Sequence, residues 1–298
     1  MSTVIGIDVG GTKIAAGVVA DAVHDVRSLP TPGSADAIID TIVSLVSDIG
    51  AGQSPAAIGI GSAGAFDAEG RVVSATDLLP GWSGTALATR VRERTGAPTA
   101  AINDVHAAAI GEARRGAAAD ARHVLIAAVG TGLGGAVIHE GQLELGHAGL
   151  AGSLGHVMSR GPARRCSCGV AGHAEALASG PGIARLYAEK TGDPVDLRAI
   201  TSRATAGDAD AVDAIRIGGE ALGDALAAAA AIADPELIVI GGGAAQVGAL
   251  LLEPARRAFR QTCMAAHSEL PIIPAALGTS AALVGAALVA RERYVGAD

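Results

Sequence analysis

Residues 7–19 read IDVGGTKIAAGVV, and this stretch decides the fold predicted for the first part of the chain. Two β-rich runs, Val4–Val9 and Ile14–Val19, flank a glycine turn, a pattern that predicts a β-hairpin. Glycines let backbone amides approach an anion closely, so the turn is either a phosphate loop or an ordinary hairpin turn. Asp8, at the end of the first strand, could hold Mg²⁺ directly or through water. The candidate anion-binding residues of the turn are Gly10, Gly11, Thr12 and Lys13.

The same pattern returns at residues 127–139, which read AAVGTGLGGAVIH. The two stretches align weakly, but both read as strand, Gly-Thr-rich turn and strand, which predicts two similar halves with one phosphate loop each. The second turn, predicted over 130–135, is not a Walker A loop, because no Gly-Lys-Ser/Thr follows, and a strand follows it where a dinucleotide fingerprint has a helix. A third glycine turn, after the strand Leu237–Ile240, could pass under an adenine and ribose. The candidate residues are Thr131, Gly132, Gly134, Gly242 and Gly243.

Composition narrows the class of protein. A chain of 298 residues has the length of two domains, and its one Trp, two Tyr and two Phe leave the core to aliphatic side chains. The formal net charge of −8 argues against nucleic-acid binding, and no apolar run reaches the roughly 20 residues of a membrane span. With no signal peptide at the start and only three cysteines, we expect a soluble cytoplasmic protein.

Polar residues follow a predicted strand at one place well suited to chemistry. Asn103 and Asp104 stand between the short strand Thr99–Ile102 and a helix predicted over Val105–Gly116. In open α/β sheets ligands bind beyond the carboxyl ends of strands, although this pair is also typical of a helix N-cap. The periodicity of apolar residues predicts a helix over Ala35–Ile49, capped by Gly50. The other predicted elements are a strand over Ala57–Gly61, an alanine-rich helix over Ala209–Ala233, helices over Gln246–Cys263 and Ser280–Arg293, and a strand over Pro271–Pro274.

The loop Gly141–Gly182 holds most of the histidine and cysteine chemistry. Cys166 and Cys168 are two apart, and His156 and His173 lie on either side of them. Two cysteines two apart are a pattern closer to metal binding than to a disulfide framework, so the loop holds a possible metal site; the alternative is a metal-free loop with two reduced thiols.

The motifs DVGGTK, ND, GTGLGG, GH followed by CSCG and Glu175, and IGGG, in this order, resemble the ROK family of sugar kinases and repressors over essentially the whole chain. The resemblance implies an α/β, two-domain, actin-like (ribonuclease H-like) ATPase fold with a sugar-binding cleft between the domains. The N-terminal sugar-binding domain would span 1–117, with the last helix, 280–298, packed back on it. The ATP-binding domain would span 118–279 and carry the zinc loop 156–175.

The resemblance also implies roles for individual residues. Asp104 would be the catalytic base, and Asn103 would bind neighbouring hydroxyls. His156, Cys166 and Cys168 would ligate a structural Zn²⁺, and His156 would also face the sugar. His173 would replace the usual fourth cysteine and complete a Cys₂His₂ site, since imidazole and thiolate both suit tetrahedral zinc. The implied substrate-binding residues are Gly64, Asn103, Asp104, Ser153, His156 and Glu175.

Two departures concern the substrate. Ser153 stands where family kinases usually have a glutamate that contacts the sugar ring, and the loop around Gly64 lacks the usual proline-glycine pair. The resemblance implies a 6-kinase for glucose or a close hexose analogue, with ATP, Mg²⁺ and structural Zn²⁺, and a homodimer. Ser153 favours the alternative of an amino or N-acetylated hexose, such as 3-amino-3-deoxyglucose, N-acetylglucosamine or N-acetylmannosamine. A non-catalytic sugar sensor, a repressor and polyphosphate as donor are the remaining alternatives; the DVGGTK strand starts too early in the chain for a preceding helix-turn-helix.

Overall fold

The computed structural model describes residues 3–49, 54–75, 79–243 and 247–296, and the chain folds into two compact units. Unit 1 comprises 1–119, 145–151 and 279–298, and unit 2 comprises 120–144 and 152–278. The predicted cap Gly50 and the predicted helix start at Gln246 lie outside the described residues.

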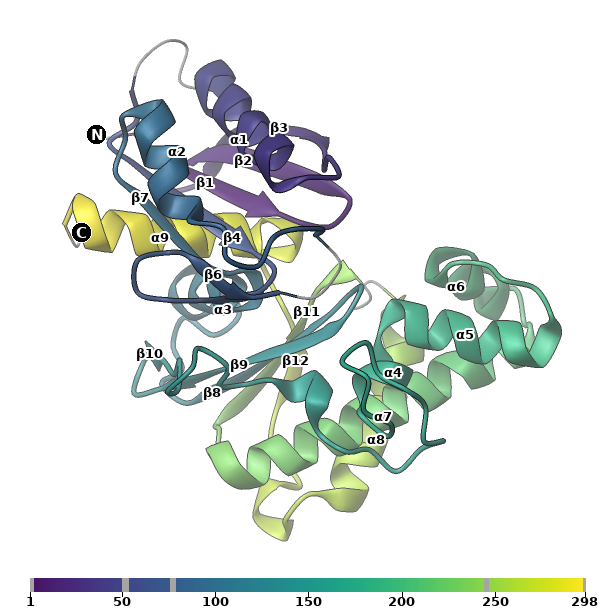
Figure 1. The fold of residues 1–298 in the computed structure, drawn as a ribbon. Coiled ribbons are helices and arrows are strands. Elements are labelled where there is room, and N and C mark those ends of the chain that lie inside the picture. Colours follow the sequence, from purple (N-terminus) through teal and green to yellow (C-terminus); the bar gives the residue numbers. More distant parts are fainter. Residues whose placement is uncertain (1–2, 50–53, 76–78, 244–246, 297–298) are drawn as a thin grey trace. The chain divides into compact units, whose positions relative to one another are not determined.

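Unit 1 is built on a five-stranded mixed sheet (Figure 1). The predicted hairpin forms its first antiparallel pair, and two further strands extend the sheet in parallel beside the first one. The strands, in spatial order, are β3 (Val23–Pro30), β2 (Lys13–Val19), β1 (Val4–Val9), β4 (Ala57–Ser62) and β7 (Thr99–Asn103). Strand β3 was not predicted: it is an edge strand exposed along nearly its whole length, so its sequence carries no alternation of apolar and polar residues. A small separate ribbon joins β5 (Ala65–Phe66) and β6 (Val72–Ser74).

Unit 2 repeats this topology. Its strands, in spatial order, are β10 (Gln142–Leu143), β9 (Leu133–His139), β8 (Val124–Val129), β11 (Leu237–Gly241) and β12 (Ile272–Pro274). Again an antiparallel hairpin comes first and two parallel strands follow on its other side. The repeat inferred from the two glycine turns is therefore a repeat of the whole sheet.

Helices cover the sheet of unit 1. They are α1 (Ala35–Ile49), α2 (Leu87–Thr95), α3 (Asp104–Arg115) and α9 (Ala281–Tyr294). Helix α9, yellow in Figure 1, lies along β1 and β4 although it is the last helix of the chain. Its backbone approaches the sheet so closely that a Cβ on Gly59 would stand 1.8 Å from the carbonyl oxygen of Ala286. Only glycine allows this contact, which fixes the helix directly beneath the strands.

Unit 2 carries a longer set of helices around its apolar core. They are η1 (Leu154–His156), α4 (Glu175–Ala178), α5 (Gly180–Thr191), α6 (Leu197–Thr205), α7 (Ala209–Ala233), α8 (Ala249–Thr262) and η3 (Ala265–His267). The long helix α7 has the predicted bounds, and it packs closely on α8 at Gly223, where a Cβ would stand 2.2 Å from the carbonyl oxygen of Ala255. Helices α5 and α6 were not predicted. The predicted loop Gly141–Gly182 holds β10, η1, α4 and the first turn of α5, so it is less irregular than the sequence suggests.

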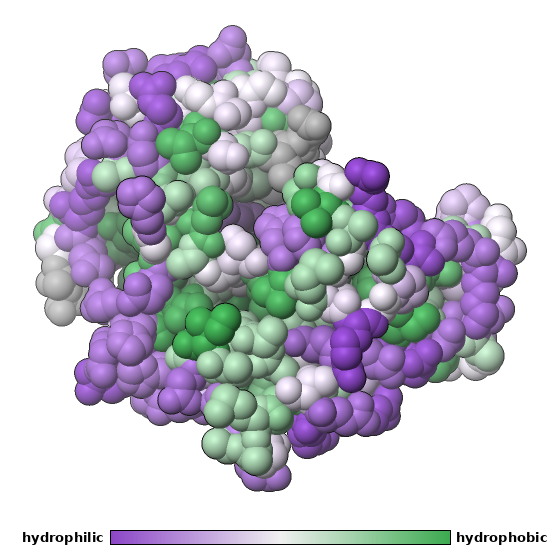
Figure 2. Space-filling view, turned by 60° about the horizontal axis from the view of Figure 1, so that its bottom comes forward, coloured by the Kyte–Doolittle hydropathy of each residue, from purple (hydrophilic) through white to green (hydrophobic). Residues whose placement is uncertain are grey.

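The surface shown in Figure 2 is largely hydrophilic, with apolar side chains in small groups. The exposed large hydrophobic side chains include Met158 and Val170, both in the loop between η1 and α4. Among the described residues, no helix has both the length and the apolar character that crossing a bilayer requires.

Candidate functional site

In unit 1, three parallel strands end at the same edge of the sheet and bring the polar candidates together. Asp8, near the end of β1, pairs with Gly61 on β4, and Ser62 at the end of β4 pairs with Asn103 at the end of β7. Asp104 follows directly, as the first residue of α3. The two carboxylates therefore belong to one cluster, as strand ends at one edge of a parallel sheet require.

Asn103 both caps α3 and orients its neighbour. Its Oδ1 accepts hydrogen bonds from the backbone N–H groups of Val105 (2.9 Å) and His106 (3.0 Å). Its Nδ2 donates to the carbonyl oxygen of Gly64 (3.0 Å) and to Oδ1 of Asp104 (3.1 Å). Asn103 can therefore be both the N-cap of α3 and a functional residue at the strand end. Gly64 belongs to the same cluster.

The environment of these carboxylates disfavours their charged forms. Burial raises the pKa of Asp104, and hydrogen bonds from Val105 N–H and Asn103 offset this only in part. Burial and the nearby Asp104 raise the pKa of Asp8 to about 7, against the attraction of Lys13. Both described hydrogen bonds from neighbouring residues reach Oδ1 of Asp104, which makes its Oδ2 the candidate proton acceptor.

The glycine turn of unit 1 is closed and held from outside. The N–H of Gly10 donates to the carbonyl oxygen of Lys13 (3.1 Å), and Gly11, Thr12 and Lys13 are exposed. Thr31 binds both sides of the turn, with its hydroxyl on the carbonyl of Gly10 (2.6 Å) and its N–H on that of Thr12 (3.0 Å). Thr31 was not predicted as part of the site, because it follows the unpredicted strand β3.

The glycine turn of unit 2 is shorter than predicted. Strand β9 begins at Leu133, so the turn proper covers 130–132 rather than 130–135, and Gly134 lies in the strand opposite Ala128. Gly242, at the end of β11, is directly adjacent: a Cβ there would stand 2.4 Å from the carbonyl oxygen of Val129. Thr131, Gly132 and Gly242 therefore lie near one another. Gly243, the other glycine candidate, follows Gly242 directly.

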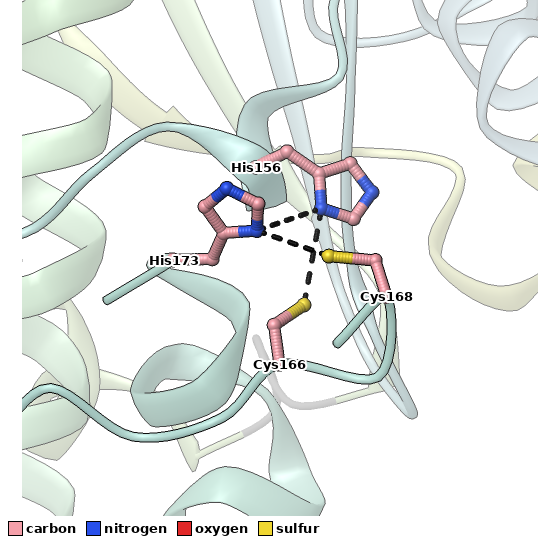
Figure 3. A group of neighbouring side chains, drawn as sticks. All are labelled: His156, Cys166, Cys168 and His173. Atoms are coloured by element: carbon pink, nitrogen blue, oxygen red, sulfur yellow. Dashed lines mark hydrogen bonds between the residues drawn. The ribbon is translucent and has the colours of Figure 1, made fainter. Parts of the chain in front are cut away.

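Four predicted metal ligands converge in unit 2 (Figure 3). Their ligand atoms lie within 4.8 Å of one another. His156 Nδ1 is 3.4 Å from His173 Nδ1 and 3.8 Å from Cys166 Sγ, and Cys168 Sγ is 3.2 Å from His173 Nδ1. Tetrahedral zinc with bonds of about 2.0–2.3 Å places its ligand atoms some 3.3–3.8 Å apart, so this donor set fits zinc.

Close backbone packing and backbone hydrogen bonds position the metal ligands. The segment that leads into His156 packs on β9 so tightly that a Cβ on Gly155 would stand 2.1 Å from the carbonyl oxygen of Leu133. An isolated antiparallel β-bridge pairs His173 with Met158, and the N–H of Cys166 donates to the carbonyl oxygen of Val170 (2.8 Å). Burial raises the pKa of the Cys166 thiol to about 11, so a metal ion that binds its thiolate would displace a proton.

Glu175 stands between this loop and the glycine turn. Its Oε2 accepts from the N–H of Leu133 (3.1 Å), and its Oε1 accepts from the Ser167 hydroxyl (2.6 Å) and the Cys166 thiol (3.3 Å). Burial raises the pKa of Glu175, but the hydrogen bonds from Ser167 and Leu133 outweigh it and hold the pKa below its usual range. Ser153 is exposed, immediately before η1.

A cavity of about 410 Å³ adjoins the turn of unit 2. Some of its polar lining residues were not predicted from the sequence. Their only sequence signal is that they lie in or near the CSCG motif and the start of α5. The polar lining residues are Thr131, Arg165, Ser167, Glu175, Ser179 and Arg185.

Comparison with known proteins gives one consistent result. The chain matches the ROK family over residues 4–293. It is 34% identical to a glucokinase of Streptomyces coelicolor over 98% of both chains, and 36% identical to an N-acetylmannosamine kinase of Escherichia coli over 97% of this chain and 98% of that one. Among solved structures, a ROK family glucokinase from Streptomyces griseus in complex with glucose and AMPPNP matches with a TM-score of 0.88 and 34% identity, over 97% of this chain and 99% of that one. The predicted family and two-domain α/β fold class are confirmed.

Proposed function

We propose that this chain, which belongs to the ROK family, is an ATP-dependent hexose kinase that phosphorylates the 6-hydroxyl of glucose. Two relatives named glucokinase, one of them solved with glucose and AMPPNP, support this assignment at 34% identity over nearly the whole chain. The observation that carries the mechanism is the half-buried Asp104 carboxylate at the sheet edge of unit 1, oriented by Asn103.

Asp104 is the proposed general base. A carboxylate within hydrogen-bond reach of the acceptor hydroxyl takes its proton as that oxygen attacks the γ-phosphorus, and such assistance contributes about 10²–10⁴-fold in rate. The raised pKa suits this role, because a base works best when its pKa lies nearer the working pH than that of an exposed aspartate. The family resemblance assigns the sugar hydroxyls to Asn103 and Gly64 and also to Ser153, His156 and Glu175.

The glycine turns and Asp8 are the proposed donor and magnesium residues. Exposed turn amides and the hydroxyls of Thr12 and Thr131 can bind phosphate oxygens, and Lys13 supplies positive charge. Asp8 would hold Mg²⁺, which neutralises the charge of the transferring phosphoryl group. Gly242 and Gly243 would lie beneath the adenosine.

Zinc is the proposed occupant of the four-ligand cluster. His156, Cys166, Cys168 and His173 would complete a tetrahedral shell with no position left for a substrate water, so the ion would be structural. The zinc ion would then hold the loop from η1 to α4 in place and fix the orientation of the His156 ring.

A second acceptor class has its own support. Ser153 is shorter than the glutamate usual in the family and is neutral, which leaves room and removes a charged acceptor. The N-acetylmannosamine kinase relative, at 36% identity, makes an N-acetylated or amino hexose the leading alternative. A homodimer, a cytoplasmic location and the two domain roles stay predictions from the family.

A coupled assay of ATP consumption tests the proposal. Purified protein with Mg²⁺ would be offered glucose, mannose, N-acetylglucosamine, N-acetylmannosamine, glucosamine and 3-amino-3-deoxyglucose, with polyphosphate as a competing donor. Glucose turnover well above that of the other sugars supports the proposal. A preference for an amino or N-acetyl sugar favours the alternative, and no turnover on any of them contradicts a hexose kinase.

A further inference from the structure

Ser167 lies between the two cysteines of the metal loop, yet its side chain is directed at a different partner. Its hydroxyl donates to Oε1 of Glu175 at 2.6 Å. This is a short hydrogen bond to a charged acceptor, the strong kind. The serine is thus bonded to a carboxylate that is itself outside the set of four metal ligands.

Glu175 carries the connection onward to the glycine turn. Its other oxygen, Oε2, accepts from the N–H of Leu133, the residue that follows the turn, at 3.1 Å. The same oxygen would stand 2.8 Å from a Cβ placed on Gly132, so the carboxylate lies directly against the tip of the turn. Ser167, Glu175 and Leu133 therefore form a continuous chain, here called the Glu175 bridge.

The bridge also borders the cavity beside the turn. Ser167, Glu175 and Thr131 all contribute to its lining. A turn that binds phosphate oxygens through its amides must hold those amides in one orientation before the ligand arrives, since ordering them on binding costs affinity. The bridge supplies such an external restraint from the metal loop.

We propose that Ser167 is a positioning residue for the phosphoryl donor: through Glu175 it fixes the turn of unit 2, so that nucleotide binding depends on an intact metal loop. This inference rests on the proposed function, because it takes the turn to be the donor site. It assigns the metal loop a task toward the donor in addition to any contact with the sugar. It also gives a role to the residue between the two cysteines.

The test measures binding of AMPPNP with excess Mg²⁺ and no sugar, by calorimetry. Ser167→Ala removes the hydroxyl but none of the four metal ligands, and we expect the dissociation constant to rise about three- to tenfold, as for loss of one hydrogen bond. Ser167→Thr keeps the hydroxyl and should bind within about twofold of wild type. Ser159→Ala is the matched control: it lies in the same loop, and its buried hydroxyl has no hydrogen-bond partner among the described residues.

A second arm removes the metal. A zinc-selective chelator in excess Mg²⁺ should weaken AMPPNP binding to wild type, but change it less in Ser167→Ala, where only the Cys166 thiol still reaches Glu175 from the metal loop. Bound zinc and the melting temperature, measured on each variant, should match wild type before chelation. Equal AMPPNP affinity in wild type and Ser167→Ala, or a chelator effect of the same size in both, would overturn the inference. No AMPPNP binding by wild type would instead contradict the proposed function.

Discussion

The two glycine turns follow strands that pair in the same way, but the carboxylates beside them have pKa values shifted in opposite directions. Asp8 pairs with Gly61 on the neighbouring parallel strand, and Ala128 pairs with Gly241 in the corresponding place of unit 2. Unit 1 thus builds its carboxylate into the strand, where burial raises the pKa to about 7. Unit 2 has alanine there and receives its carboxylate, Glu175, from α4.

That difference separates the tasks of the two carboxylates. Burial raises the pKa of both Asp8 and Asp104, and the nearby Asp104 raises that of Asp8 further, which suits a metal ligand and a proton acceptor. Glu175 is held ionised by hydrogen-bond donors on both of its oxygens, which suits a fixed acceptor. The same topology therefore carries reactive carboxylates in one unit and a positioning carboxylate in the other.

The largest effect on activity is expected from neutralising Asp104. Asp104→Asn keeps the shape of the side chain but cannot take a proton, so we expect kcat to fall about 10²–10⁴-fold with little change in KM. Steady-state kinetics with the preferred sugar measures this. Asp48→Asn, an equal change of charge at an exposed position of α1, serves as control. Activity of Asp104→Asn near the wild-type level would refute the assignment of the base.

The raised pKa of Asp8 predicts a dependence of magnesium binding on pH. A carboxyl with a pKa of about 7 is mostly protonated at pH 6 and mostly ionised at pH 8, and only the ionised form binds Mg²⁺. The Mg²⁺ concentration for half-maximal activity should therefore be about tenfold higher at pH 6 than at pH 8. Asp8→Asn should remove this pH dependence. A wild-type profile that is flat between these pH values would contradict a titrating metal ligand.

A smaller effect is expected from adding a carboxylate to unit 2. Ser153→Glu restores the residue usual in the family, and a new hydrogen bond to a sugar hydroxyl should raise kcat/KM for glucose relative to the amino and N-acetyl sugars about fivefold. Competition between two sugars in one assay measures the ratio directly. Ser153→Gln, which has the same length without charge, separates the effect of charge from that of size. An unchanged ratio in both variants would show that Ser153 does not set the preference.

The sequence predicts best where a pattern repeats or a residue type is chemically restricted. The glycine turns gave both hairpins, the alanine-rich run gave α7 with its observed bounds, and the family resemblance carried by the GH and CSCG motifs gave the four side chains that converge. Because Asn103 and Asp104 directly follow a predicted strand, their position at the edge of the sheet was also predicted. Each of these depends on residues near one another in the chain.

The contacts that escaped prediction depend on tertiary structure. Strand β3 is exposed and polar, so only its hydrogen bonds to β2 define it, and Thr31 was missed with it. The Glu175 bridge joins Glu175 to Leu133, 42 positions away, through a backbone N–H, which every residue except proline possesses. No side-chain pattern announces such a donor.

The close seat of α9 on Gly59 has a consequence for how the protein is made. A ribosome releases β1, β4 and β7 long before residues 281–294 exist, so the sheet of unit 1 must wait for the helix that covers it. Unit 2 likewise needs a late element, its edge strand β12 at Ile272–Pro274. The half with the proposed catalytic base therefore cannot cover its sheet until nearly all of residues 1–294 have been made.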